Sequence, residues 1–166
     1  RSGLGLGAGD LLFWPPTTYE RKEIVRRLRD IKPATSFRSA YAYDNLLYSV
    51  AGEVVEAVSG KVWEDFVLER ILAKVGMTSS NVRHSAAAEG GNVAATHAKV
   101  EGVLRVVKPS VNDNTNPAGG INSCAEDMAK WMQVLLGQGR LPDGTRLFSD
   151  RTYRELTTLV TPMPNP

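Results

Sequence analysis

Residues 43–60 read Tyr-Asp-Asn-Leu-Leu-Tyr-Ser-Val-Ala-Gly-Glu-Val-Val-Glu-Ala-Val-Ser-Gly, and this stretch decides the fold of the chain. Its apolar side chains recur at helical spacing, so we expect a mostly buried helix with a broad apolar face over about residues 45–58. Ser59-Gly60 closes it, because glycine readily adopts the left-handed conformation common at helix ends. The apolar residues of this helix are Leu46, Leu47, Val50, Ala51, Val54, Val55 and Val58.

Capping-box patterns predict two further helix starts, since the first and last residues of such a pattern satisfy free backbone N–H groups at a helix N-terminus. Thr17-x-x-Glu20 precedes an amphipathic stretch that Pro33 ends, and Ser123-x-x-Glu126 precedes another that ends at Gly137 or Gly139. The basic residues of the first stretch face away from its apolar side, so we expect them on solvated surface. They are Arg21, Lys22, Arg26, Arg27 and Arg29.

The remaining periodicity completes a helix-rich chain. Helices are expected over about residues 62–75, with Glu64, Asp65 and Glu69 on a solvated face, and from near Ser149 to 159. Alternation around Glu101-Gly102 predicts a small β-hairpin over about residues 98–107. The fold class expected from these patterns is mostly α with a small β-hairpin and no large sheet. We expect residues 1–166 to form a single helix-rich partial domain, with a proline-rich tail over 160–166.

Loops are expected over residues 78–94 and 109–116, which are polar or rich in turn-forming residues. The glycine-rich residues 3–10 lack the Lys-Ser/Thr that follows a phosphate-binding loop, so they are interpreted as a turning surface loop. The chain has no initiating Met, and we expect that a segment preceded it.

Composition excludes several classes of function. The chain carries 20 basic and 18 acidic residues, a net charge of +2 that is too small to indicate a nucleic acid or an anionic membrane as partner. No apolar stretch approaches the roughly 20 residues that a membrane-spanning helix needs. Cys124 is the single cysteine, which excludes an internal disulfide, and its small and apolar neighbours predict a buried, inert thiol. We expect no cofactor.

The spacing of the polar residues does not indicate a metal site or a Ser-His-Asp triad. His84 and His97 lack any recurrent zinc-ligand spacing, so no metal site is expected. The carboxylates of Glu53 and Glu56 are better explained by a solvated helix face than by a general acid–base pair. The chain contains neither Gly-x-Ser-x-Gly nor Ser-x-x-Lys, the motifs that present a nucleophilic serine.

Tyr43-Asp44-Asn45, just before the 45–58 helix, is the constellation with catalytic promise. A tyrosine phenolate serves as a general base when cationic neighbours lower its pKa from about 10. An amide two residues on can bind a substrate carbonyl or hold a lysine ammonium. Taken alone, the tripeptide is explained more simply by a packed tyrosine and an asparagine that caps the helix.

The context of this tripeptide is more specific. Residues 37–56, Phe-Arg-Ser-Ala-Tyr-Ala-Tyr-Asp-Asn-Leu-Leu-Tyr-Ser-Val-Ala-Gly-Glu-Val-Val-Glu, resemble a signature of the β-lactamase-related serine hydrolases. These include class C β-lactamases, D-alanyl-D-alanine carboxypeptidases and family VIII esterases. Three other segments resemble family elements in the same order: Arg1-Ser2-Gly3-Leu4, Leu72–Thr78 with its Gly-Met pair, and Pro117–Ser123 followed by Asp127–Trp131.

The resemblance implies acyl transfer through a serine ester, with a Ser-x-x-Lys nucleophile and a third motif on an edge strand. In this family Tyr43 would shuttle the proton, and Asn45 would contact the substrate amide and the lysine. Ser-x-x-Lys would fall before residue 1 and the third motif after residue 166. The chain then corresponds to the helical subdomain of the β-lactamase/transpeptidase-like α+β fold, with the main sheet largely missing, and by itself it is expected to be inactive.

Several alternatives stay open at the level of sequence. The substrate implied by the family is a β-lactam, a D-Ala peptide or a carboxylic ester, and the chain could instead derive from a non-catalytic scaffold or binding module of the same fold. The family resemblance implies a periplasmic or secreted protein. Removal of the sheet would expose apolar surface, so we expect self-association or marginal stability of these residues alone.

Overall fold

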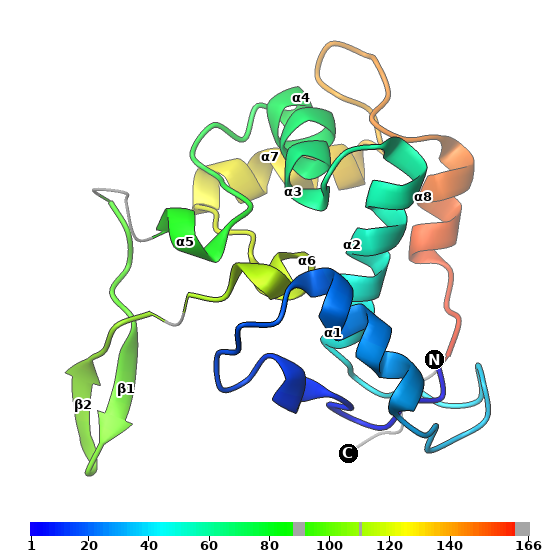
Figure 1. Cartoon of the computed structure of the whole chain (residues 1–166). Coiled ribbons are helices and arrows are strands. Elements are labelled where there is room, and N and C mark those ends of the chain that lie inside the picture. The colour runs from blue at the N-terminus through cyan, green and yellow to red at the C-terminus, as the bar shows by residue number, and fades with distance from the viewer. Residues whose placement is uncertain (88–91, 110, 162–166) are drawn as a thin grey trace.

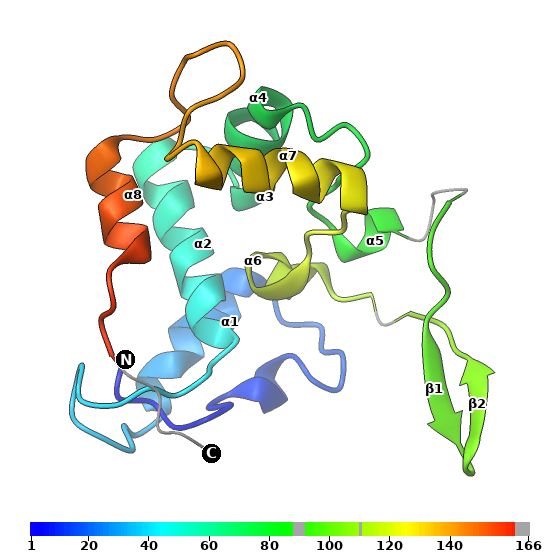
Figure 2. The ribbon, with the colours of Figure 1, turned by 180° about the vertical axis from the view of Figure 1, so that it is seen from behind.

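The computed structural model describes residues 1–87, 92–109 and 111–161, and most of the expected tail (162–166) lies outside these residues. Helix α2 (Leu46–Ser59) stands at the centre of the helical part (Figure 1). It contacts α1 (Arg21–Arg27), α3 (Trp63–Val67) and α6 (Asn116–Gly119). Beyond these lie α7 (Ala125–Leu136), on the far side of α3, and α8 (Asp150–Thr157), as the reverse view shows (Figure 2). This helix-rich architecture agrees with the expected fold class.

The predicted 45–58 helix is confirmed in its boundaries but not in its burial. It ends at Gly60, whose φ of +72° is the left-handed conformation expected there. The side chains of Val54 and Val58 are 55% and 84% exposed, so the prediction of a mostly buried helix is wrong for the described residues. The helix buries a narrow stripe instead, made of Leu46, Ser49 and Gly52.

Gly52 lets α2 approach α6 closely. A Cβ atom at this position would lie 2.5 Å from Pro117 Cγ, which is far below the contact distance of two non-bonded carbon atoms. The absence of a side chain on α2 therefore allows the Asn-Pro-Ala-Gly turn of α6 to pack directly on the helix backbone.

The main apolar core lies between the helix that follows α2 and helix α7. The predicted 62–75 helix is confirmed as a continuous run of α3, a π-helical turn (Leu68–Leu72) and α4 (Ala73–Val75), and it ends at Gly76 with φ +77°. Its inner side packs with Trp131 of α7. The buried members of this core are Val67, Leu72, Val75, Met77, Val82 and Val134.

Neither predicted capping box forms. Helix α1 starts at Arg21, and the Thr17 hydroxyl donates to the Leu12 carbonyl oxygen at 2.7 Å instead of capping it. Helix α7 starts at Ala125, while the Ser123 hydroxyl lies 2.8 Å from that of Ser80. In both cases the hydroxyl is used in a tertiary or loop contact, and the helix begins beyond it, four residues after Thr17 and two after Ser123.

Cys124 occupies the N-cap position of α7 in an extended conformation, and its side chain is exposed. The expectation of a buried thiol is therefore wrong. Cys124 precedes the first helical residue, and the buried residues of α7 are Asp127 and Val134.

The start of the last helix is confirmed, because the Ser149 hydroxyl accepts a hydrogen bond from the Thr152 N–H at 3.1 Å. The helix ends at Thr157, short of the expected residue 159. Within the expected loop over 78–94, residues 84–87 form a short helix, α5 (His84–Ala87), and residues 88–91 lie outside the described part. The glycine-rich residues 3–10 turn sharply, with positive φ at Gly3, Gly7 and Gly9.

The predicted hairpin is confirmed as an antiparallel pair of β1 (His97–Val100) and β2 (Val103–Val106). Glu101 and Gly102 both have positive φ, as a two-residue turn that matches the strand twist requires. The hairpin projects away from the helices (Figure 1). No helix in the described ranges combines the length and apolar character needed to cross a bilayer.

We expect this chain to self-associate, because large apolar side chains are open to solvent on the helices and on the segment that follows α8. Leu136 and Leu159 are 82% and 96% exposed, in addition to Val54 and Val58 on α2. Sedimentation equilibrium should show the weight-average mass rising with concentration, and a V54Q/V58Q variant should shift the rise to higher concentration. A monomer at all concentrations with a sharp, high Tm would contradict this expectation.

Candidate functional site

The loop that ends in Tyr43-Asp44-Asn45 turns its middle residue inward and its tyrosine outward. Asp44 is 3% exposed, and its Oδ1 accepts a hydrogen bond from the Leu46 N–H at 2.9 Å, so the aspartate satisfies the first turn of α2. Burial raises the pKa of the Asp44 carboxyl, with the backbone hydrogen bonds of Leu46 and Leu47 opposing the shift. The Tyr43 side chain is 46% exposed.

This arrangement overturns the simpler explanation of the tripeptide. Tyr43 is not a packed core tyrosine, and Asn45 makes no side-chain capping hydrogen bond. Instead, Asn45 Nδ2 lies 3.5 Å from Oδ1 of Asp10, a long contact to the N-terminal segment. Asp44 does the capping, which leaves the tyrosine and the asparagine on either side of it available for other contacts.

The glycine-rich N-terminal segment is laid against this loop. The N–H of Gly7 donates to the Tyr43 carbonyl oxygen at 2.9 Å, and the Gly3 carbonyl oxygen accepts from the N–H groups of Ala34 and Thr35. Gly3 has φ +97°, and a Cβ there would lie 2.7 Å from the Thr35 carbonyl oxygen. Only glycine fits this position, so the Ser-Gly-Leu segment and the Tyr43 loop are built to pack together.

Between the two segments lies a cavity of about 420 Å³ that Tyr43 lines. Its wall consists of apolar, small and hydroxyl-bearing residues, and none of those described there is charged. The cavity therefore offers a phenol in apolar surroundings, without the cation that a tyrosine base requires. The lining residues are Leu4, Gly5, Leu6, Ala34, Thr35, Ala40, Tyr41, Ala42 and Tyr43.

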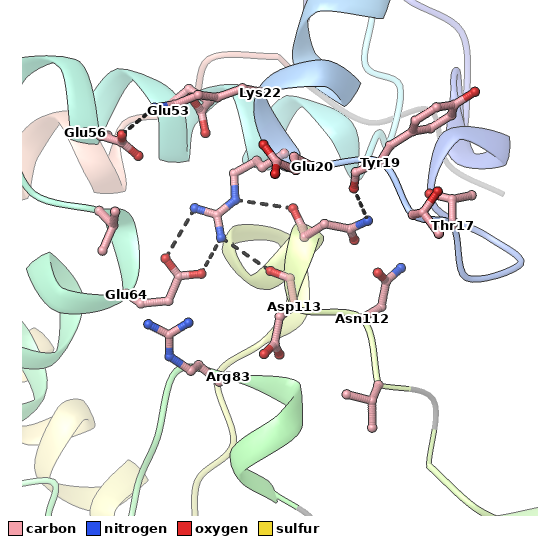
Figure 3. Close-up of a pocket in the computed structure, with 15 residues that line it drawn as sticks. Thr17, Tyr19, Glu20, Lys22, Glu53, Glu56, Glu64, Arg83, Asn112 and Asp113 are labelled. Atoms are coloured by element: carbon pink, nitrogen blue, oxygen red, sulfur yellow. Dashed lines mark hydrogen bonds and ion pairs between the residues drawn. The ribbon is translucent and has the colours of Figure 1, made fainter.

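A larger cavity, of about 620 Å³, opens elsewhere and contains neither Tyr43 nor Asn45 (Figure 3). Charged side chains dominate its wall, among them Glu53, Glu56 and Arg83. Lys22 reaches across to Glu56 with an Nζ–Oε1 distance of 2.8 Å. Burial, followed by repulsion from Glu56, raises the pKa of the Glu53 carboxyl. The glutamates expected on a solvated face thus line an open groove.

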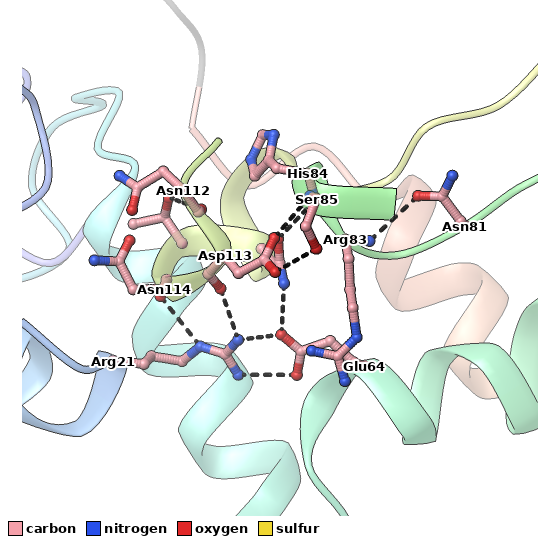
Figure 4. Close-up of polar contacts among 11 residues, drawn as sticks. Arg21, Glu64, Asn81, Arg83, His84, Ser85, Asn112, Asp113 and Asn114 are labelled. Carbon is pink, nitrogen blue, oxygen red and sulfur yellow. Dashed lines mark hydrogen bonds and ion pairs between the residues drawn. The ribbon is translucent and has the colours of Figure 1, made fainter. Parts of the chain in front are cut away.

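Arg21 and Glu64 form a buried ion pair at the edge of this groove (Figure 4). Their side chains are 13% and 5% exposed, so the expectation that both lie on solvated helix faces is wrong. Arg21 also donates from Nε to the Asn114 carbonyl oxygen at 3.2 Å, and Asn116 Nδ2 donates to Glu64 Oε1 at 2.8 Å. Burial opposes ionisation of Glu64, but the hydrogen bonds from Arg21 and Asn116 outweigh it and lower its pKa.

The network continues through the loop before α6. Asp113 accepts two hydrogen bonds from Ser85, from the backbone N–H at 3.0 Å and from the hydroxyl at 2.6 Å. The His84 N–H donates to Asn116 Oδ1 at 3.2 Å. We call the set Arg21, Glu64, Ser85, Asp113 and Asn116 the polar network; it ties α1, α3, α5 and α6 together around α2, at whose N-terminus the Tyr43 loop sits.

The remaining sequence candidates lie apart from Tyr43. His84 starts α5, whereas His97 is in β1, with its Nδ1 at 2.8 Å from the Ala95 carbonyl oxygen. Sequence reasoning missed Asp10 and Asn116 as polar partners. For Asn116 the sequence offers one signal, its position directly before Pro-Ala-Gly-Gly. The last glycine of this run, Gly120, leaves room for the Asn116 side chain, because a Cβ atom on Gly120 would lie 2.4 Å from Asn116 Oδ1.

Comparison with known proteins matches residues 1–163 to the family model described as Beta-lactamase. The chain belongs to the β-lactamase family. Among curated proteins of this kind, Gigasin-6 of Magallana gigas is 27% identical over 138 residues, and an unguisins hydrolase of Aspergillus campestris is 30% identical over 125 residues. Penicillin-binding protein 4 of Amycolatopsis lactamdurans is 26% identical over 111 residues. These alignments cover 81%, 74% and 65% of this chain.

Solved structures share the fold of this chain. A penicillin-binding protein homologue from Pyrococcus abyssi has a TM-score of 0.77 at 20% identity, and it covers 98% of this chain. A D-stereospecific amidohydrolase from Streptomyces has a TM-score of 0.75 at 22% identity and covers 97%. The chain spans 37% and 50% of these two structures, and 45%, 23% and 29% of the three curated relatives. It is therefore similar to a part of each.

Replacing Glu64 by Gln should destabilise the fold by about 3–5 kcal/mol, because it leaves the Arg21 guanidinium buried without its anion. Folding lowers the pKa of Glu64, so the ionised carboxylate stabilises the folded protein at any pH above its ordinary pKa of 4.5. This contribution is lost as the pH falls from 4.5 through the lowered pKa of the folded state. Urea unfolding should therefore show a shallower acid loss in E64Q than in the parent chain.

The matched control is E69Q, because Glu69 is 52% exposed in its pair with Lys61 and the expected change is below about 1 kcal/mol. Equal effects of E64Q and E69Q would show that the polar network does not hold the helices.

Proposed function

We propose that this chain is the helical part of a serine hydrolase that works through an acyl-enzyme, and that it supplies Tyr43 and Asn45 to the active site. The observation that carries the proposal is the exposed phenol of Tyr43 at a cavity, on a loop anchored by Gly7, in a chain of the β-lactamase family. The nucleophile, in a Ser-x-x-Lys motif, lies outside these residues.

In this scheme the serine hydroxyl attacks the substrate carbonyl, and its proton passes to the phenolate oxygen of Tyr43, which the protonated lysine of Ser-x-x-Lys keeps ionised. The tyrosine then returns a proton to the leaving group as the acyl-enzyme forms. The cation that makes Tyr43 a competent base is the lysine of Ser-x-x-Lys, which explains why the described wall of the cavity needs no charge of its own. Asn45 donates from its amide, held near Asp10, and its oxygen accepts from the substrate or the lysine.

A penicillin-binding protein and a D-stereospecific amidohydrolase are among the proteins that this chain resembles. We propose a β-lactam, a D-Ala peptide or a related amide or ester as substrate. From the resemblance we also expect a periplasmic or secreted location. A non-catalytic scaffold of the same fold is the alternative, and the presence of Ser-x-x-Lys before Arg1 separates the two.

Intact mass measured after incubation with a fluorophosphonate or a penicillin tests the placement of the nucleophile. The chain of residues 1–166 should form no adduct, whereas a polypeptide extended at its N-terminus should gain one acyl or phosphonyl group on the serine of Ser-x-x-Lys. A stoichiometric adduct on a serine within residues 1–166 would overturn the proposal. An extended protein without Ser-x-x-Lys would favour the scaffold.

In the extended protein, Tyr43→Phe should lower the acylation rate about 10²- to 10⁴-fold, because it removes the proton carrier and keeps the ring. Tyr41→Phe is the matched control, since Tyr41 lines the same cavity and is 48% exposed, yet carries no assigned role. Asn45→Ala should also lower kcat/KM. Stopped-flow acylation with a chromogenic ester measures all three, and equal rates for Y43F and Y41F would remove Tyr43 from the mechanism.

A further inference from the structure

A basic pocket is lined by residues of the 138–148 loop and of α8. The loop leads directly into α8 at the outside of the helical part (Figure 1). The pocket encloses about 580 Å³ and shares no residue with the Tyr43 cavity or the polar network. Three of its six lining residues are arginines. The set is Gln138, Arg140, Arg146, Asp150, Tyr153 and Arg154.

Arg140 and Arg146 face each other across an isolated antiparallel bridge. The flanking hydrogen bonds run from the Leu141 N–H to the Thr145 carbonyl oxygen and from the Leu147 N–H to the Gly139 carbonyl oxygen, both at 2.8 Å. This pattern makes the two arginines a non-hydrogen-bonded pair, in which opposed side chains come closest. Like charges directly opposite one another destabilise a strand pair, so this pairing of positions is electrostatically unfavourable.

Only part of this positive charge is compensated. Arg146 Nη2 lies 2.5 Å from Asp150 Oδ1, and Arg146 Nη1 donates to the Gln138 carbonyl oxygen at 3.1 Å. Within the described ranges, the guanidinium groups of Arg140 and Arg154 have no ion pair and no side-chain hydrogen bond. Three arginines and one aspartate leave the pocket with two surplus positive charges.

The backbone that carries the arginines is held in place. Gly139 has φ +88°, and a Cβ at this position would lie 2.7 Å from Phe148. Phe148 in turn packs against the apolar core, and Ser149 caps the helix that carries Arg154. The backbone positions of the arginines are therefore fixed, which lowers the entropic cost of bringing their side chains to one ligand.

We propose that this pocket binds a phosphate-type oxyanion, with the guanidinium groups of Arg140 and Arg154 as its charged donors and the Tyr153 hydroxyl as a neutral one. Guanidinium groups match the geometry of phosphate oxygens in paired hydrogen bonds, and a dianion equals the surplus charge of the pocket. Binding would also relieve the repulsion between Arg140 and Arg146. The site is independent of the proposed hydrolase chemistry.

The full-length protein should be titrated with inorganic phosphate against chloride at matched ionic strength. Calorimetric titration should give a saturable binding isotherm for phosphate, and Tm should rise with the logarithm of phosphate concentration, whereas a general salt effect gives no saturable isotherm. Arg140→Gln and Arg154→Gln should each weaken phosphate binding at least tenfold. Arg151→Gln, on the same helix but paired with Glu155 and 84% exposed, should leave binding unchanged.

A second readout keeps the test independent of folding defects. In chloride alone, R140Q should be no less stable than the parent protein, because the substitution removes a like-charge contact. Titration with glycerol 3-phosphate separates the two sources of the oxyanion: tighter binding of the ester indicates a phosphorylated ligand, and equal binding indicates the free anion. The absence of a saturable phosphate isotherm, or the same phosphate affinity in R140Q, R154Q and R151Q, would overturn the proposal.

Discussion

The buried ion pair of Arg21 and Glu64 is the constraint on which the arrangement of the helices depends. Two charges removed from water cost several kcal/mol each unless their partners are well placed, and here Asn116 and the Asn114 carbonyl oxygen complete the set. The pair thus requires α1, α3 and the turn before α6 to meet at one point. An apolar contact at the same place would tolerate sliding, whereas a buried pair that loses its partner is strongly penalised.

Helix α2 is held inside this frame, and the site follows from its position. Gly52 brings the helix backbone against Pro117, while its N-terminus is satisfied by Asp44. Because Asp44 turns inward, Tyr43 on one side of it points to the cavity and Asn45 on the other reaches towards Asp10. One capping interaction therefore orients both residues of the Tyr-x-Asn motif.

The described residues leave the Tyr43 cavity without a charged side chain in its wall, and they leave apolar side chains of α2 and of the C-terminal segment exposed. A surface of this kind is expected where a helical layer packs on a second layer, and the chain spans half or less of the solved relatives it matches. The basic pocket beside α8 differs from this surface, because two of its arginines, Arg140 and Arg146, lie opposite each other on a turn fixed by Gly139.

Local chemistry allowed the sequence by itself to determine the helices over residues 46–59, 63–75 and 125–136, the hairpin at Glu101-Gly102 and the Tyr43–Asn45 motif. Periodicity, left-handed glycines and motif spacing depend on neighbours along the chain, so they can be read without the fold. Only the tertiary structure decided that Arg21 and Glu64 are buried, that Cys124 is exposed and that Asp44 caps the helix. These outcomes depend on which distant segments meet: Glu64 is 43 residues from Arg21, and no local pattern encodes that contact.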